Sequence, residues 1–196
     1  YCARVSNPSN QVNTETSERL IRYLVKHQHW SPLEMVNACL EIETTRDIAH
    51  QIVRHRSFAF QEFSQRYANP EEQGDMFEYS EARLQDTKNR QNSIETSDVE
   101  LQAWWDAQQK FVTEISKKIY DEALKKGIAK EQARKVLPEG LTKTKLYMNG
   151  SLRSWIHYIE LRSANGTQKE HMEIAHACAK VIAGIFPLMS ELQQGE

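Results

Sequence analysis

Residues 36–56 read VNACLEIETTRDIAHQIVRHR, and this stretch joins the pattern of a strand to the pattern of a helix. Apolar and polar side chains alternate over residues 36–43, which is typical of a strand with one buried face. The threonines at 44–45 can cap a helix, whose apolar residues recur on one face over residues 48–53. Three basic residues, 54–56, end the helix. The stretch therefore predicts a fold that mixes strands and helices.

The rest of the chain is mostly helical in pattern. Apolar residues at helical spacing predict helices over residues 15–28, 133–136, 152–159 and 172–182. A long helix is predicted from a capping box at Ser97 and Glu100 to Gly127. Its apolar stripe comprises Leu101, Trp104, Phe111, Ile115, Ile119 and Ala123. The class is mixed α and β, rich in helix and with few strands.

Two further segments complete the outline. Alternation over residues 142–148 predicts a second strand, and Asn149-Gly150-Ser151 predicts a turn after it. Residues 70–96 are polar and weakly periodic, so we expect an irregular segment that is either a functional lid or disordered. Within it, residues 89–91 either close over a ligand or form a solvated loop. We expect residues 1–196 to form a single domain.

Composition excludes several classes of protein. The net charge of −2 at 196 residues argues against a cationic nucleic-acid coat. A mean hydropathy of −0.69 and the lack of an apolar run near 18 residues argue against a membrane span. The chain starts with Tyr1 rather than Met, which indicates a trimmed N-terminus, and no signal peptide is visible.

Three cysteines, Cys2, Cys39 and Cys178, are odd in number and far apart, which disfavours a disulfide framework. No metal-binding spacing of Cys or His is present, so we expect no metal site. Reduced thiols are typical of a cytoplasmic protein. We expect Cys39 and Cys178 to be buried, and none of the three lies in the basic surroundings that activate a nucleophile.

The segment after the helix is the most informative for function. Arg54-His55-Arg56 is followed by Glu62, Ser64 and Arg66, with phenylalanines between them. Clustered guanidinium groups and a hydroxyl suit a phosphate, and aromatic neighbours can flank a flat ring. The residues alone leave two interpretations: an anionic ligand that bears a ring, or a structural face of ion pairs at a helix end.

This segment resembles the signature of the flavin-dependent thymidylate synthases: Arg-His-Arg, seven residues, then Ser64. Further stretches match the family's landmarks in the same order along nearly the whole chain. They are Ala3-Arg4-Val5-Ser6, His29-Trp30-Ser31-Pro32-Leu33-Glu34, Ala133-Arg134-Lys135-Val136-Leu137-Pro138 and Leu161-Arg162.

The resemblance implies a helix-rich α/β fold with a small, mainly antiparallel sheet, assembled as a homotetramer. It implies synthesis of dTMP from dUMP, with methylenetetrahydrofolate as carbon donor and FAD, reduced by NADPH, as hydride carrier. It implies small-molecule substrates, with no nucleic-acid polymer and no membrane as partner. A thiolate nucleophile is not needed in this family, which agrees with the cysteine pattern.

The resemblance also assigns residues to the site. The FAD contacts are Ser31, Arg54, His55, Arg56, Glu62, Ser151, Arg153 and His157. The dUMP contacts are Gln51, Arg54, Glu62, Phe63, Ser64, Gln65, Arg66, Arg134 and Arg162. Arg162 matches the family's activating residue, which helps ionise N3 of the pyrimidine. Because Arg153 and His157 are four apart, we expect them on one helix face, opposite Trp155.

The chain departs from the family at two positions. Ser151 stands where many members have Asn, and Gly166 replaces the usual His after the catalytic Arg. Two rival functions stay open at this point. One is a non-catalytic module that binds phosphate or nucleic acid through Arg54, Arg56 and Arg66, and the other is a flavin reductase that has lost methyl transfer.

Overall fold

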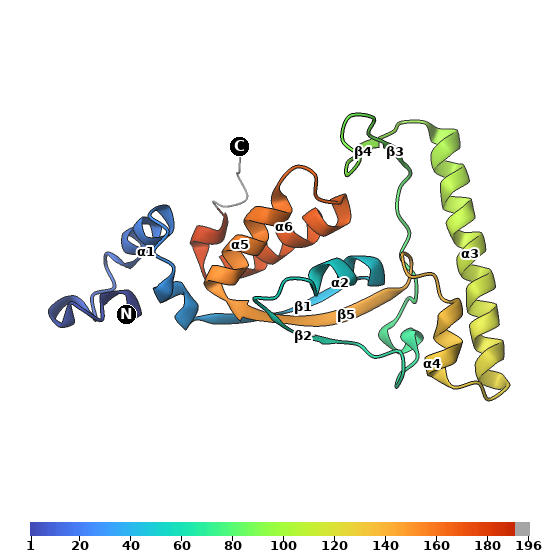
Figure 1. Cartoon of the computed structure of the whole chain (residues 1–196), viewed down its shortest axis with the longest axis horizontal. Helices are drawn as coiled ribbons and strands as arrows, with labels where there is room; N and C mark the ends of the chain where they lie inside the picture. The colour runs from blue at the N-terminus through green and yellow to red at the C-terminus, as the bar shows by residue number, and fades with distance from the viewer. Residues whose placement is uncertain (191–196) are drawn as a thin grey trace. The chain divides into compact units, whose positions relative to one another are not determined.

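The computed structural model describes residues 1–190, which divide into two compact units. The first unit contains residues 1–40, 55–59 and 148–190, and the second contains residues 41–54 and 60–147. Elements are labelled as in Figure 1. Three strands, β1, β5 and β2, each continue from one unit into the other.

These strands are β1 (Asn37–Thr45), β5 (Lys143–Ser151) and β2 (Ala59–Glu62), in the spatial order β1-β5-β2. β1 and β5 run antiparallel: the Leu152 amide, just after β5, donates to the Val36 carbonyl, just before β1. In the middle of both strands the Tyr147 hydroxyl donates to the Glu41 carboxylate over 2.6 Å, and at the other end the Arg46 amide donates to the Thr142 carbonyl. The alternation predicted in the first strand is present, with Ile42 and Thr44 buried. The expected small antiparallel sheet is therefore confirmed.

The first unit is built around two helices that lie side by side, α5 (Leu152–Ser163) and α6 (Lys169–Ala183) (Figure 1). Trp155, Ile159, Ala175 and Ala179 are fully buried and form its core. The indole Nε1 of Trp155 also donates to the Ala38 carbonyl over 3.0 Å. The other elements of this unit are α1 (Ser17–Lys26) and the 3₁₀ turns η1 (Cys2–Arg4), η2 (Pro8–Asn10), η3 (Ser31–Met35) and η6 (Pro187–Ser190).

The second unit contains the long helix α3 (Val99–Lys125). Beside α3 lies α4 (Lys130–Ala133), followed by η5 (Arg134–Val136), and the unit also holds α2 (Arg46–Ile52). Gly127 ends α3 with a φ of 81°, as the sequence predicted. Two glutamines of α3 fasten an extended segment to the helix. Gln102 bonds both the amide and the carbonyl of Ala82, and Gln109 does the same for Ser80.

Two predictions about α3 need correction. Asp98, not Ser97, is the N-cap, and its carboxylate accepts from the Leu101 amide over 3.0 Å. The apolar stripe exists but is not buried: Trp104, Phe111 and Ile119 are 45–59% exposed. The buried side of the helix instead carries Gln109, Thr113 and Tyr120, because the first two bond the extended segment.

We expected residues 70–96 to be irregular, but part of this segment has regular structure. It contains a capped 3₁₀ turn, η4 (Pro70–Gln73), and a two-stranded hairpin of β3 (Arg83–Gln85) and β4 (Ser93–Glu95). The predicted turn at 149–151 is also wrong, because these residues end β5. Within residues 1–190, no helix is both long and apolar enough to cross a membrane.

Candidate active site

Helix α5 carries a group of predicted site residues in the first unit. Ser151 is its N-cap, where the hydroxyl accepts from the Ser154 amide over 3.2 Å. Arg153 and His157 are exposed, whereas Trp155 is fully buried. The prediction that Arg153 and His157 share a face opposite the tryptophan is confirmed.

Glu34 joins two of these residues, and this role was not predicted from the sequence. One carboxylate oxygen accepts from the Ser151 hydroxyl over 2.6 Å, and the other from the Arg153 guanidinium over 2.7 Å. These hydrogen bonds lower the pKa of Glu34. Glu34, Ser151 and Arg153 line a pocket of about 400 Å³, with Asn37, Ser57, Ala59, Asn149, Gly150 and Ser154.

An aromatic pair lies near the same helix face. The ring of His157 packs against Trp30 at a centroid distance of 4.7 Å. Ser31, the next residue, is exposed at the start of η3. Arg56 is also exposed, and its guanidinium has no ion pair within the described residues. The first unit therefore offers an exposed cation at Arg56, an exposed hydroxyl at Ser31 and the ring pair of Trp30 and His157.

The residue predicted to be catalytic, Arg162, contacts a residue of the Arg-His-Arg motif. Its Nε–H donates to Nε2 of His55 over 2.9 Å. Burial lowers the pKa of His55 to about 4, and the positive charge of Arg162 adds to this effect. His55 is therefore neutral near pH 7 and accepts the hydrogen bond at Nε2, which leaves the ring proton on Nδ1.

Tyr158 and His171 form a buried pair that packs beside this contact. The Tyr158 ring packs edge-on against His55 at 4.9 Å, and its hydroxyl bonds Nε2 of His171 over 3.1 Å. Burial lowers the pKa of His171 to about 3 and raises the pKa of Tyr158. Tyr158 and His171 were missed from the sequence because they lie on apolar helix faces, where a core role is the ordinary interpretation.

In the second unit, Glu62 is held by two residues from other elements. Its Oε1 accepts from the Arg46 guanidinium over 3.2 Å and from the Thr144 hydroxyl over 2.9 Å. Neither partner was singled out from the sequence. Arg54 is exposed and has no side-chain partner among residues 1–190. Gln51, one turn earlier, is partly buried.

The residues predicted for dUMP continue after β2. The Phe63 amide donates to the Lys145 carbonyl, and the Ser64 carbonyl accepts from the Tyr67 and Ala68 amides. Arg66 lies 3.6 Å from Glu131, and Glu131 is close in sequence to the half-buried Arg134. The predicted Arg66 and Arg134 are thus both associated with the α4–η5 segment.

Gln65 is a buried residue of this unit whose side-chain amide lacks a partner among residues 1–190. Only 3% of the residue is exposed, yet its Nε2 has no hydrogen-bond partner in the described part of the chain. A buried amide without a partner costs about 1–3 kcal/mol. A carbonyl oxygen of a pyrimidine would satisfy this donor, so the residues present fit the predicted nucleotide.

The predicted residues fall into both units. Ser31, His55, Arg56, Ser151, Arg153, His157 and Arg162 belong to the first, and Gln51, Arg54, Glu62, Phe63, Ser64, Gln65, Arg66 and Arg134 to the second. Within the first unit the donor set also fits a flavin dinucleotide. The unpaired Arg56 suits a diphosphate, and the hydroxyl-lined pocket beside Ser151 can accept a polar group.

Comparison with known proteins agrees with this chemistry. A family model described as "Thymidylate synthase complementing protein" matches residues 1–188. A "Probable flavin-dependent thymidylate synthase" of Paramecium bursaria Chlorella virus 1 is 49% identical over 97% of this chain and 87% of its own. A "Flavin-dependent thymidylate synthase" of Synechocystis sp. is 52% identical over 97% of this chain and 85% of its own.

A solved structure shares the fold. It is the UMP/dUMP methylase PolB from Streptomyces cacaoi, bound with 5-Br dUMP, with a TM-score of 0.80 and 24% identity. The alignment covers 97% of this chain and 87% of that one. At this identity the likeness concerns the fold alone.

The chain is thus a mixed α/β protein, rich in helix and with a small antiparallel sheet. It belongs to the flavin-dependent thymidylate synthase family, as the match over residues 1–188 and the two close relatives show. The resemblance seen in the sequence is confirmed.

Proposed function

We propose that this chain makes dTMP from dUMP with FAD as its cofactor. Family membership and the names of its relatives support this activity, in agreement with the sequence analysis. The structural observation that carries the proposal is the contact between Arg162 and His55. It joins the residue predicted to activate dUMP to the motif predicted to bind the flavin.

Residues of the first unit would hold the flavin. Arg56 supplies a charge for the diphosphate, His157 lies against the Trp30 ring, and Ser31 and Ser151 supply hydroxyls. Arg153 contributes its guanidinium together with Glu34, which holds it in place. When bound, FAD supplies the hydride chemistry of the reaction.

Residues of the second unit would hold the nucleotide. The exposed Arg54, with Arg66 and Arg134, suits the phosphate, and the buried Gln65 amide suits a carbonyl of the uracil ring. Glu62 is already fixed by Arg46 and Thr144, so its geometry is set before a ligand arrives. Gln51, Phe63 and Ser64 complete the proposed set.

Arg162 acts on the ring electrostatically. Its Nε is occupied by His55, which orients the remaining N–H groups of the guanidinium. In the role that the resemblance implies for Arg162, a fixed cation stabilises the negative charge that develops on uracil as N3 ionises. Because His55 is neutral near pH 7, it neither neutralises nor repels the positive charge of Arg162.

The finer parts of the proposal concern co-substrates and assembly. NADPH and methylenetetrahydrofolate are proposed as reductant and carbon donor. A homotetramer is proposed, and the uncovered apolar side chains of α3, including Trp104, Phe111 and Ile119, support contact with further copies. A cytoplasmic location is proposed from the three free cysteines. Residues 1–196 are proposed to act as one functional domain.

The purified protein provides the test. We expect it to bind FAD with the absorbance of a flavoprotein, to elute as a tetramer by light scattering, and to form dTMP when NADPH, methylenetetrahydrofolate and dUMP are supplied. Flavin reduction without dTMP would indicate a reductase. A colourless protein whose affinity for RNA or DNA falls steeply with salt would instead favour nucleic-acid binding.

A further inference from the structure

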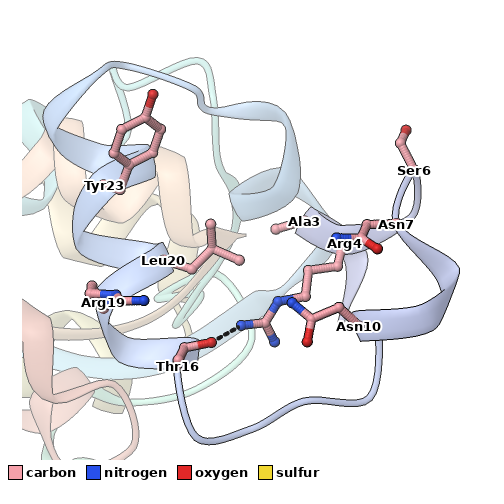
Figure 2. Close-up of a pocket in the computed structure, with 9 residues that line it drawn as sticks. All are labelled: Ala3, Arg4, Ser6, Asn7, Asn10, Thr16, Arg19, Leu20 and Tyr23. Carbon is pink, nitrogen blue, oxygen red and sulfur yellow. Dashed lines mark hydrogen bonds between the residues drawn. The ribbon is translucent and has the colours of Figure 1, made fainter.

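Another pocket lies in the first unit, among η1, η2 and α1 (Figure 2). Its volume is about 510 Å³, and none of the residues assigned above to FAD or dUMP lines it. The lining residues are Ala3, Arg4, Ser6, Asn7, Asn10, Thr16, Arg19, Leu20 and Tyr23.

Two arginines give this pocket its charge. Arg4 is only 7% exposed, and its guanidinium donates to the Asn13 carbonyl and, over 2.7 Å, to the Thr16 hydroxyl. A guanidinium has more N–H donors than these two bonds use. Arg19 comes from the neighbouring helix and lines the same pocket (Figure 2).

The pocket contains no neutralising acid. Among the described residues that line it there is no carboxylate, and Arg19 has no ion pair within residues 1–190. The contrast with Arg22, on the same helix, is informative. Arg22 pairs with Glu18 over 2.7 Å and does not line the pocket. The helix thus neutralises the arginine outside the pocket and leaves the one that lines it unpaired.

The remaining lining groups suit a tetrahedral oxyanion. Ser6, Asn7 and Asn10 also line the pocket and provide a hydroxyl and two amides. A phosphate monoester has three terminal oxygens and close to two negative charges near pH 7, so it can use several donors from different directions. A carboxylate has only two oxygens and one charge.

We propose that this pocket binds the 2′-phosphate of NADPH. This inference rests on the proposed function, whose reaction uses three phosphate-bearing molecules. Residues elsewhere are assigned to FAD and to dUMP, but no residues have been assigned to the phosphate monoester of NADPH. The pocket therefore selects NADPH over NADH, which differs only by lacking this group.

The test compares Arg19→Gln with the matched control Arg22→Gln. Both positions are exposed, so both variants keep the fold, and Arg4 is left intact because its bonds hold the N-terminal turns. Inorganic phosphate is titrated by calorimetry, and steady-state flavin reduction is measured with NADPH and with NADH. We expect Arg19→Gln to weaken phosphate binding and to raise KM for NADPH about tenfold, the scale of one charge-assisted hydrogen bond. KM for NADH should stay unchanged, and Arg22→Gln should match the wild type.

A second variant, Asn7→Asp, places a negative charge in the pocket and should produce the same selective loss. The proposal is overturned if KM rises equally for NADPH and NADH, or if phosphate binds Arg19→Gln as well as it binds the wild type. It is also overturned if only KM for methylenetetrahydrofolate rises, which would assign the pocket to folate carboxylates. Phosphate binding can be measured without turnover. A protein that binds phosphate in this pocket but binds neither FAD nor dUMP would therefore refute the proposed function, while the pocket would still be an anion site.

Discussion

The Nε of Arg162 and the Nε2 of His55 are joined by a hydrogen bond of 2.9 Å across 107 positions of sequence. The bond requires His55 to be a neutral acceptor, and the pKa of about 4 meets this requirement. Protonation of His55 would replace the acceptor with a second N–H and place two cations side by side. The arrangement is therefore sensitive to acid.

The first prediction concerns acid stability. His55 and His171 have pKa values of about 4 and about 3 in the fold, against an ordinary value of 6.5. Because both values are lowered, the unfolded chain binds more protons, so their contribution is complete above pH 6.5 and is lost as pH falls toward 4. Each histidine contributes a slope of up to about 1.4 kcal/mol per pH unit. Urea unfolding between pH 7 and 4 measures this loss.

His171→Gln isolates one of the two contributions, since an amide can still bond the Tyr158 hydroxyl but does not titrate. We expect its unfolding free energy to depend less on pH than that of the wild type. His27→Gln, at an exposed position, is the matched control for loss of a histidine. Equal slopes in all three proteins would show that burial of His171 does not determine acid stability.

The elements that the sequence predicted are those with a buried face. The helices α1, α5 and α6 and the strand β1 each pack one side inward, so their apolar spacing is visible in the sequence. The hairpin β3–β4 was missed because its residues are almost all exposed and carry no alternation. Its single apolar pair, Leu84 opposite Ile94, gives too weak a signal.

β2 was missed for a different reason. It has only four residues at the edge of the sheet, and its phenylalanine was interpreted as a neighbour of a ligand ring. The site itself was predicted through the family resemblance, residue by residue. The partners Glu34, Arg46, Tyr158 and His171 could not be predicted, because their roles depend on contacts between segments far apart in sequence.

The second prediction concerns the thiols. Cys178 is buried, which raises the pKa of its thiol to about 12, and so it is not a thiolate at neutral pH. Cys2 and Cys39 are exposed, which corrects the expectation that Cys39 is buried. We expect Cys2→Ser and Cys39→Ser to form dTMP at wild-type rates. Cys178→Ala should lose about 1 kcal/mol of stability and keep its turnover once folded. Loss of turnover by orders of magnitude in any folded variant with bound FAD would indicate a thiolate mechanism.

The third prediction concerns Gly150 in β5. A Cβ at this position would lie 2.6 Å from Cε1 of Phe58, so the ring of Phe58 occupies the space that any side chain needs. Phe58 in turn packs on Trp155 at 4.9 Å and follows the Arg-His-Arg motif closely. Gly150→Ala should destabilise the fold by about 1–3 kcal/mol through overpacking.

The same substitution should weaken FAD binding, because displacement of Phe58 moves the nearby His55 and Arg56. Thermal unfolding and flavin titration measure the two effects. Gly127→Ala is a useful comparison, since it strains a positive φ at the end of α3 without touching Phe58. If Gly150→Ala binds FAD normally, the contact with Phe58 does not position the motif.

The last prediction concerns Arg162. Its guanidinium is partly buried at the end of α5, and His55 fixes it through Nε. In the proposed role its charge is needed more as uracil becomes anionic than in the resting complex. Loss of a contact made in the transition state lowers kcat, whereas loss of a uniform contact raises KM. Arg162→Ala should therefore bind FAD and oxidise NADPH, yet form dTMP about a hundredfold more slowly.

Arg162→Lys separates charge from geometry. The lysine ammonium keeps the positive charge, but it lacks the planar guanidinium fork of arginine. It cannot bond His55 and also present two parallel N–H groups to the pyrimidine ring, so we expect only partial recovery. Arg153→Lys, on the outer face of α5, is the control for loss of an arginine from the same helix and should affect FAD affinity rather than the step on dUMP. Rates at saturating dUMP, measured alongside flavin content, distinguish these outcomes. If Arg162→Ala forms dTMP normally under these conditions, the hydrogen bond to His55 has a structural role and another group activates the pyrimidine.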